Sequence, residues 1–448
     1  MIEKCGKLKP EKILFTVLDG LGDHAYRELD GLTPLEKAYS NGIKRLKENG
    51  SQGLMDIISP GVPPSSDVSH LIMFGYDIEN EYFGRGPIEA LGEGVELREG
   101  EIAFRGNLAT VRIENNYPIV IDRRAGRISS EQTRELVEYL NDEIECPEGC
   151  RVVFKPLSEH RFVMIISGRG LSHEITDTDP HAEGKPILLC QPIDEAKDKK
   201  GAERLANIVN EITIQAIEKL SKHELNKKRA GNNLPQANAI LVRSAGTMRR
   251  MKSFREKWDL KAACVAAGLL YKGVAKAVGM DVYNVEGANG LLNTNIQGKT
   301  SKAVELLESY DFVYLHFKGT DVASHSKNPL AKYEFIKRFY ESLKIIDDTI
   351  LNTTTIVITG DHTTPCDRGM HTGEPVPILI SSKGLRSDST KVFSEREAAH
   401  GGLGRIRGGD IMPILLDSIE RTVEYGTRPS PRRINYMPKE LTYLRLDI

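Results

Sequence analysis

The chain has 448 residues, 40% of them hydrophobic and 28% charged, and carries a formal net charge of −2. This composition is typical of a folded globular protein, and the length favours two domains or one large domain with an insertion. Without a basic excess, composition gives no support for nucleic acid or an anionic membrane as a partner. The opening MIEKCGKLKPEK lacks the apolar stretch of a secretory signal, and no run reaches the ~18–20 apolar residues of a membrane span. We therefore expect a cytoplasmic protein.

Five short apolar runs predict buried β-strands. They are too continuous for half-exposed strands and suit a parallel sheet that is covered on both faces. The runs are ILFTVL (13–18), AACVAA (262–267), FVYLHF (312–317), TTIVIT (354–359) and VPILIS (376–381). Residues 332–351 repeat apolar side chains at three- and four-residue steps, which predicts one long amphipathic helix. Alternating strands and helices predict a doubly wound, mostly parallel α/β sheet with helices on both faces.

A second domain is predicted inside the first. Between about residues 99 and 253 the arginines cluster, and polar stretches interrupt the alternation of strands and helices. We therefore expect a core domain of residues 1–98 and 254–448 and an inserted, smaller α/β domain of residues 99–253.

The six cysteines are scattered along the chain, at positions 5, 146, 150, 190, 264 and 366. Cys146 and Cys150 lie close together but lack the second Cys/His pair of a structural zinc site. We expect reduced thiols, as is usual in a reducing cytosol.

Aspartates and histidines follow three of the predicted strands. Asp19 ends the first run, Asp321 and His325 follow FVYLHF, Asp361 and His362 follow TTIVIT, and His371 comes nine residues later. Ligands in open α/β sheets gather at the carboxyl ends of the strands, so these segments are expected to converge on one crevice. Carboxylate and imidazole suit hard or borderline divalent ions. Each residue alone is a common loop residue, but together they predict a metal site.

A serine opens a predicted helix in PGVPPSSDVSH (60–70). Ser66 is either the N-cap of this helix or a nucleophile, and Ser65 leaves a one-residue ambiguity. The start of a helix favours a bound phosphate, and coordination to a metal lowers the pKa of a hydroxyl. Ser66 is therefore the candidate nucleophile, whereas an isolated histidine such as His70 is expected to be structural or exposed rather than catalytic.

These motifs resemble the 2,3-bisphosphoglycerate-independent phosphoglycerate mutases, in their archaeal-type branch within the alkaline phosphatase superfamily. The matching stretches run in order to about residue 408. They include VLDGLGD (17–23), PGVPPSSDVSH (60–70), DRRAGRI (122–128), DTDPH (177–181), KGTDVASH (318–325) and TGDHTTP (359–365). The resemblance implies an alkaline-phosphatase-like core and an isomerase of glycolysis and gluconeogenesis. Such an enzyme interconverts 3- and 2-phosphoglycerate through a phosphoserine, without 2,3-bisphosphoglycerate.

The resemblance also implies roles for individual residues. Asp321, His325 and His371 would hold one metal ion, and Asp19, Asp361, His362 and Ser66 a second. Mn²⁺ is the favoured ion, and Zn²⁺, Co²⁺ and Mg²⁺ are compatible with these ligands. The substrate is a small anion, and its expected contacts are Arg123, Arg124, Arg161, Arg243 and Lys257. Arginine suits this role because its planar fork binds carboxylate and phosphate bidentately. A homo-oligomer is compatible with the sequence.

Two alternatives remain open. A related two-metal phosphatase, phosphopentomutase or phosphodiesterase would share the metal ligands but not the substrate, and DRRAGRI and DTDPH in the insertion argue against it. A non-catalytic metal-binding or regulatory relative would be expected to have lost part of the ligand set or the serine. The sequence retains them all, which favours an enzyme.

Overall fold

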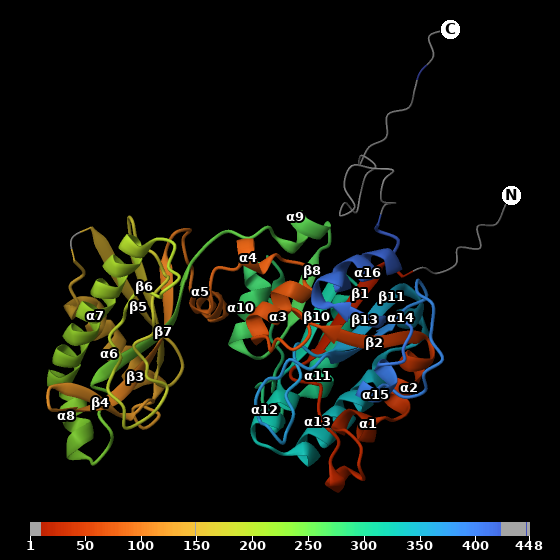
Figure 1. Ribbon diagram of the computed structural model, residues 1–448, viewed down its shortest axis with the longest axis horizontal. Helices are drawn as coiled ribbons and strands as arrows, with labels where there is room; N and C mark the ends of the chain where they lie inside the picture. The colour runs from red at the N-terminus through yellow and green to blue at the C-terminus, as the bar shows by residue number, and fades with distance from the viewer. Residues whose placement is uncertain (1–9, 148, 423–444, 446–448) are drawn as a thin grey trace. The chain divides into compact units, whose positions relative to one another are not determined.

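The chain folds into two compact units, Met1–Tyr82 with Met251–Ile448 and Phe83–Arg250. The computed structural model (Figure 1) describes residues 10–147, 149–422 and 445. The first unit is called the core unit below and the second the inserted unit. The first junction lies before the predicted residue 99, because helix α5 (Arg85–Gly92) packs on strands β3 (Ile102–Glu114) and β7 (Ala239–Thr247) of the inserted unit. Helix α5 lies so close to β3 that a Cβ atom at Gly86 would be 2.3 Å from the carbonyl oxygen of Ala103.

An eight-stranded sheet forms the centre of the core unit, in the order β13-β2-β12-β11-β1-β10-β8-β9. Its strands are β1 (Lys12–Leu18), β2 (Gly50–Asp56), β8 (Ala262–Val265), β9 (Asp281–Tyr283), β10 (Phe312–Phe317), β11 (Thr354–Thr359), β12 (Val376–Ser381) and β13 (Gly404–Arg407). All five predicted strands are confirmed. Only β12 runs against its neighbours β11 and β2. Residues 360–375 between β11 and β12 contain no helix, and the chain returns without the crossover that a parallel pair requires.

Helices cover both faces of this sheet, as the side chains of β10 show. Phe312 and Tyr314 contact Phe74 of helix α3 (Ser66–Met73), at its C-terminal end, with ring centroids 6.0 and 5.1 Å away. Phe317 points to the other face, where its ring centroid lies 5.3 Å from that of Phe339 in α13 (Pro329–Ser342). Alternate residues of a strand face opposite sides of the sheet. Since both sides are covered by helices, β10 is buried along its whole length. The predicted α/β class is confirmed.

Twelve α-helices are described in the core unit. They are α1 (Pro34–Ala38), α2 (Asn41–Glu48), α3, α4 (Ile78–Glu81), α9 (Phe254–Trp258), α10 (Leu269–Ala277), α11 (Ile296–Leu306), α12 (Gly319–His325), α13, α14 (Asp348–Thr353), α15 (Glu395–Ala398) and α16 (Ile411–Ser418). The prediction of a single helix over 332–351 is wrong. Helix α13 ends at Ser342, and a 3₁₀ turn (Leu343–Ile345) follows it. A new helix, α14, then begins because Asp347 caps it by accepting a hydrogen bond from the Ile350 amide.

The inserted unit has an antiparallel sheet, in which β4 (Tyr117–Asp122), β3, β6 (Arg161–Gly168) and β5 (Cys150–Pro156) are neighbours and β7 also pairs with β3. Its remaining helices are α6 (Ser130–Glu143), α7 (Lys199–Lys222) and α8 (Glu224–Gly231). Apolar side chains of α6 and α7, including Leu136 and Leu205, pack with Phe154 and Phe162 of the sheet. None of the described helices, not even the 24-residue α7, is long and apolar enough to cross a bilayer.

Cys146 and Cys150 form a disulfide, so the expectation of reduced thiols is wrong for this pair. The chain turns between them, with the Cys150 amide donating to the Pro147 carbonyl, and the two Cα atoms come within 5.9 Å. Cys190, Cys264 and Cys366 are free and buried, as expected, and Cys5 lies outside the described residues.

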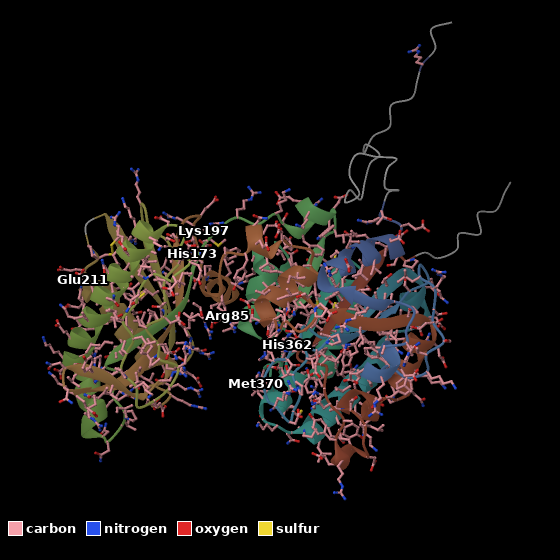
Figure 2. The ribbon with its side chains drawn as sticks, viewed as in Figure 1. Arg85, His173, Lys197, Glu211, His362 and Met370 are labelled. Carbon is pink, nitrogen blue, oxygen red and sulfur yellow. A yellow bond between two sulfur atoms is a disulfide. The ribbon has the colours of Figure 1, made fainter. Side chains whose placement is uncertain are left out.

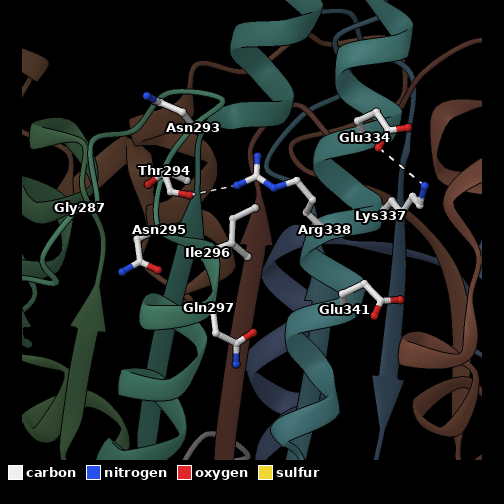
Figure 3. A pocket seen from close by; sticks show the side chains of 10 residues that line it. All are labelled: Gly287, Asn293, Thr294, Asn295, Ile296, Gln297, Glu334, Lys337, Arg338 and Glu341. Carbon is white, nitrogen blue, oxygen red and sulfur yellow. Dashed lines mark hydrogen bonds and ion pairs between the residues drawn. The ribbon is translucent and has the colours of Figure 1, made fainter.

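A surface hollow of about 550 Å³ lies between the loop before α11 and the face of α13 (Figure 3). Arg338 reaches across it and donates to the carbonyl groups of Leu292 and Thr294, at 2.8 and 3.4 Å. The guanidinium therefore holds the loop in place.

A buried ion pair joins α2 to the loop after β12. Lys47 Nζ lies 2.7 Å from Asp388 Oδ1, and the two side chains are 1% and 8% exposed. Burial alone would raise the pKa of Asp388, but the hydrogen bonds from Lys47, Thr390 and the Gln52 amide hold it well below its ordinary value of 3.8. The pair therefore stabilises the fold above about pH 4, and this contribution is lost as the pH falls.

Replacing Asp388 by Asn should lower the free energy of unfolding at pH 7 by about 3–5 kcal/mol, because a buried ammonium loses its partner. Denaturant titrations between pH 7 and pH 3 should show this deficit shrinking as the pH drops below 4. Asp30→Asn is the control, since its partner Lys37 and Asp30 itself lie at the surface. A deficit that stays constant with pH would contradict this account.

Candidate metal centre and anion-binding cluster

Three adjacent parallel strands carry the acidic residues. β1 pairs with β11 on one side and with β10 on the other, so the carboxyl ends of all three meet at one edge of the sheet. Asp19 follows β1 directly, Asp361 follows β11 after one glycine, and Asp321 lies in the first turn of α12 after β10. Strand order thus explains why segments three hundred residues apart in sequence come together.

Asp19, Asp361 and His362 form one compact group. His362 Nε2 lies 3.3 Å from Asp19 Oδ1 and 3.3 Å from Asp361 Oδ2, and all three side chains are fully buried. His362 is labelled in Figure 2, with Met370 on the loop that follows it. These are three of the four ligands predicted for the second ion.

Asp321 is the centre of a second group. Its Oδ1 lies 3.2 Å from His325 Nε2, as expected for residues at i and i+4 of a helix, and 3.8 Å from His371 Nε2. The His371 ring also stacks on His362 at a centroid distance of 3.5 Å. All six predicted Asp and His ligands are therefore brought together, and the two groups adjoin each other.

Within the described residues, one oxygen of each aspartate is buried without a hydrogen-bond partner. The three atoms are Asp19 Oδ1, Asp321 Oδ1 and Asp361 Oδ2. The other oxygens are all engaged, by the Tyr271 hydroxyl, the Lys318 ammonium and the Gly20 amide respectively. A buried anionic oxygen without a partner is costly. Asp19 Oδ1 and Asp361 Oδ2 face His362, and Asp321 Oδ1 faces His325 and His371. Carboxylate oxygens and imidazole nitrogens are donors that suit divalent cations, so the residues fit the two-metal site that the motifs imply.

The buried carboxylates repel one another and attract a neighbouring lysine. Burial and the negative charge of Asp19 raise the pKa of Asp361. Lys318 Nζ lies 2.7 Å from Asp321 Oδ2 and 3.3 Å from Asp19 Oδ2. Although burial alone would lower its pKa, these two carboxylates raise the pKa of Lys318, which keeps its positive charge.

Three residues around Asp19 were not among the predicted site residues. Tyr271 donates to Asp19 Oδ2, Lys318 lies beside the same oxygen, and His316 Nε2 is 3.4 Å from it, with the Tyr271 and His316 rings stacked at 3.5 Å. Lys318 follows FVYLHF directly, so its place at the end of a strand was a usable signal. Tyr271 lies in an amphipathic helix, where the sequence offers no such signal.

Ser66, rather than Ser65, faces the metal centre. Ser66 is the first residue of α3, and its Oγ lies 3.2 Å from His362 Nε2. Ser65 occupies the N-cap position and donates its hydroxyl to Asp67 Oδ1 at 2.7 Å. His70 is fully buried, with Nδ1 2.6 Å from the Ser66 carbonyl oxygen.

Arginines of the inserted unit lie on three neighbouring strands. Arg243 of β7 is opposite Arg105 of β3, and Arg161 of β6 is opposite Asn107 of β3. Burial and the charge of Arg161 lower the pKa of His160 to about 4, so this imidazole is neutral. Like charges on facing strands repel, and such an arrangement suits an anionic ligand.

Asp179 joins two of the predicted arginines. Arg123 binds its carboxylate bidentately, at 2.9 and 2.6 Å, and Arg243 binds it at 2.5 Å. The Asp179 side chain is fully buried, whereas Arg123 and Arg243 remain partly exposed. Asp179 lies in the DTDPH motif, but nothing in the sequence indicated that it orients the arginines.

Two further predicted substrate contacts are not on these three strands. Arg124 is exposed and its backbone amide donates to Asp122. Lys257 belongs to the core unit, where its ammonium is 3.1 Å from Glu81 and 4.5 Å from the centroid of the Tyr76 ring.

Comparison with known proteins identifies the family. The model of the family "2,3-bisphosphoglycerate-independent phosphoglycerate mutase" matches residues 48–226. A relative of that name from Pyrococcus abyssi is 46% identical, over 93% of this chain and 99% of its own length. The chain belongs to the 2,3-bisphosphoglycerate-independent phosphoglycerate mutase family. The family resemblance drawn from the motifs is confirmed.

Solved structures agree with this assignment. A protein from Pyrococcus horikoshii superposes on this mutase-family chain with a TM-score of 0.79 and 40% identity, covering 93% of this chain and 100% of its own. The cofactor-independent phosphoglycerate mutase from Thermoplasma acidophilum gives a TM-score of 0.68 and 35% identity, with 91% and 100% coverage.

Neutralising one carboxylate should stabilise the metal-free protein. In chelated samples, Asp361→Asn should raise the free energy of unfolding by about 1–3 kcal/mol, because a buried carboxylate that lacks a hydrogen bond at Oδ2 and is repelled by Asp19 is neutralised, while the bond from the Gly20 amide is kept. Thermal unfolding after exhaustive chelation measures this gain. Asp56→Asn is the matched control. Asp56 is also buried but pairs with Arg405 at 2.6 Å, so its neutralisation should give no gain. Equal effects of the two substitutions would contradict the electrostatic account.

Proposed function

We propose that this chain interconverts 3-phosphoglycerate and 2-phosphoglycerate without 2,3-bisphosphoglycerate, by moving the phosphoryl group through Ser66. Family membership supports the overall reaction. The observation that carries the role of Ser66 is its position, with Oγ 3.2 Å from His362 Nε2 at the edge of three buried carboxylates. Ser65, the alternative left open by the sequence, instead donates its hydroxyl to Asp67 Oδ1.

Two divalent cations complete the proposed site. Asp321, His325 and His371 would hold one of them. Asp19, Asp361, His362 and the Ser66 oxygen would hold the other. Mn²⁺ remains the favoured ion. When bound, such ions lower the pKa of the serine hydroxyl and stabilise negative charge on the transferring phosphoryl group.

The proposed reaction exchanges one ester bond for another. Ser66 Oγ attacks phosphorus in line as the bond from phosphorus to the glycerate oxygen breaks, and that oxygen leaves as a glycerate hydroxyl after taking up a proton. The other hydroxyl of glycerate then attacks phosphoserine and releases Ser66. Glycerate must stay bound between the two steps, since water admitted at this stage would hydrolyse the phosphoserine.

We propose that the arginines of the inserted unit supply this retention. Arg123 and Arg243 are oriented by Asp179, and Arg161 lies on the neighbouring strand. Guanidinium groups bind carboxylate and phosphate in planar, bidentate geometry. The inserted unit would therefore act as a substrate-binding cap, while Arg124 and Lys257 would make weaker contributions.

Ser66→Ala should abolish mutase turnover and the phosphoenzyme. A coupled assay with 3-phosphoglycerate, run with and without 2,3-bisphosphoglycerate, measures turnover, and protein mass measures phosphorylation. Ser65→Ala is the matched control and should retain turnover, because only an N-terminal hydrogen bond to Asp67 is lost. Chelation should silence the wild-type enzyme and Mn²⁺ should restore it. Turnover by Ser66→Ala would transfer the role to another group.

Weakening the arginine cluster should convert part of the reaction into hydrolysis. Arg161→Ala or Arg243→Ala should reduce isomerisation more than release of inorganic phosphate, so the ratio of phosphate to 2-phosphoglycerate should rise several-fold. Arg112→Ala is the control. This residue lies on the same strand as Arg105 but is 68% exposed and pairs with Glu114. An unchanged product ratio would show that the cluster does not retain glycerate.

A further inference from the structure

Lys332 of α13 is buried between the two loops that carry the metal ligands Asp19, Asp361 and His362. Its Nζ lies 2.8 Å from Asp23 Oδ2, 3.1 Å from the Gly22 carbonyl oxygen and 3.2 Å from the Thr364 carbonyl oxygen. The side chains of Lys332 and Asp23 are both fully buried. The three N–H groups of the ammonium are matched by three acceptors. Two of them, the Gly22 carbonyl and the Asp23 carboxylate, belong to the loop after β1, and the Thr364 carbonyl belongs to the loop after β11.

Asp23 is the second aspartate of VLDGLGD, and it ties the same two loops together from the other side. Its carboxylate accepts hydrogen bonds from the Tyr26 hydroxyl at 2.5 Å, the Cys366 amide at 3.0 Å and the Cys366 thiol at 3.1 Å. Tyr26 belongs to the loop after β1, and Cys366 to the loop after β11. The Lys332–Asp23 pair is thus the junction of both loops with α13.

A short chain of contacts leads from this junction to a metal ligand. Lys332 holds the backbone of Thr364, and the Thr364 hydroxyl lies 2.8 Å from His362 Nδ1. That contact leaves His362 Nε2 facing Asp19, Asp361 and the Ser66 hydroxyl. Partners on the outer nitrogen of a ligating histidine fix the orientation of its ring.

We propose that Lys332, paired with Asp23, is a positioning residue that sets the spacing of the two ligand-bearing loops and thereby the metal affinity of the site. Its ammonium makes no contact with the metal centre itself. The inference rests on the two-metal site of the proposed function. Its competitor is a purely structural role, in which the pair only contributes to global stability. A second buried pair in the same unit, Lys47–Asp388, separates these roles because it joins α2 to a loop that carries no predicted ligand.

The test compares Lys332→Met with Lys47→Met in the full-length protein. Calorimetric titration of the chelated proteins with Mn²⁺ gives the metal affinity, and thermal unfolding gives stability. Both substitutions should lower the Tm. Lys332→Met should also weaken Mn²⁺ binding by about 10-fold, the lower end of the range for a direct outer partner of a metal ligand, because Lys332 acts on His362 through Thr364. Lys47→Met should bind Mn²⁺ as the wild type does.

The double variant Lys332→Met/Asp23→Asn removes both charges, so no buried charge is left without its partner. It should regain much of the lost stability and still bind Mn²⁺ weakly, and it replaces the single variant if Lys332→Met does not fold. Recovery of wild-type affinity in the double variant, or equal Mn²⁺ affinities of Lys332→Met and Lys47→Met, would overturn the positioning role. Failure of the wild-type protein to bind Mn²⁺ would instead overturn the two-metal site.

Discussion

Three buried carboxylates at the ends of adjacent strands are the constraint on which the rest of the core unit depends. Asp19, Asp321 and Asp361 each keep one oxygen without a protein hydrogen bond, although burial makes such an oxygen costly. No packing of apolar side chains relieves this cost. The surroundings instead engage the opposite oxygen of each carboxylate, with Lys318 and Tyr271 serving two of them. The oxygens that lack a hydrogen bond lie beside the ring nitrogens of His325 and His362, and together they form groups that could hold a cation.

Sequence reasoning worked where a single strand determines the outcome. FVYLHF and TTIVIT became β10 and β11 at the predicted residues, and the acids that follow them converged because the strands are parallel neighbours. It failed where the outcome depends on the conformation of a connection or on the pairing of strands. The direction of β12 depends on its helix-free connection, and the end of α13 on a cap at Asp347. The role of Asp179 depends on strand register in the inserted unit, which periodicity does not encode.

The charged clusters of the two units differ in sign. The core unit gathers carboxylates, whereas the inserted unit places Arg105 opposite Arg243 and relieves their repulsion only in part, through Glu89 and Asp179. The two clusters therefore differ in local charge, with carboxylates gathered in the one and guanidinium groups in the other. These local charges agree with the proposed reaction, in which guanidinium groups would hold an anionic substrate and cations would act on its phosphoryl group.

The buried polar junction around Asp23 is better explained by geometry than by stability. Exchanging a buried ion pair for apolar side chains of similar volume is often neutral or stabilising, so Lys332 and Asp23 are weak evidence for a stability role. Cys366 fits the same interpretation. Burial raises the pKa of its thiol to about 12, so it stays protonated and serves as a hydrogen-bond donor to Asp23 rather than as a metal ligand. Polar groups here connect specific backbone positions, which an apolar core between the two loops would leave free to shift, and the orientation of His362 depends on those positions.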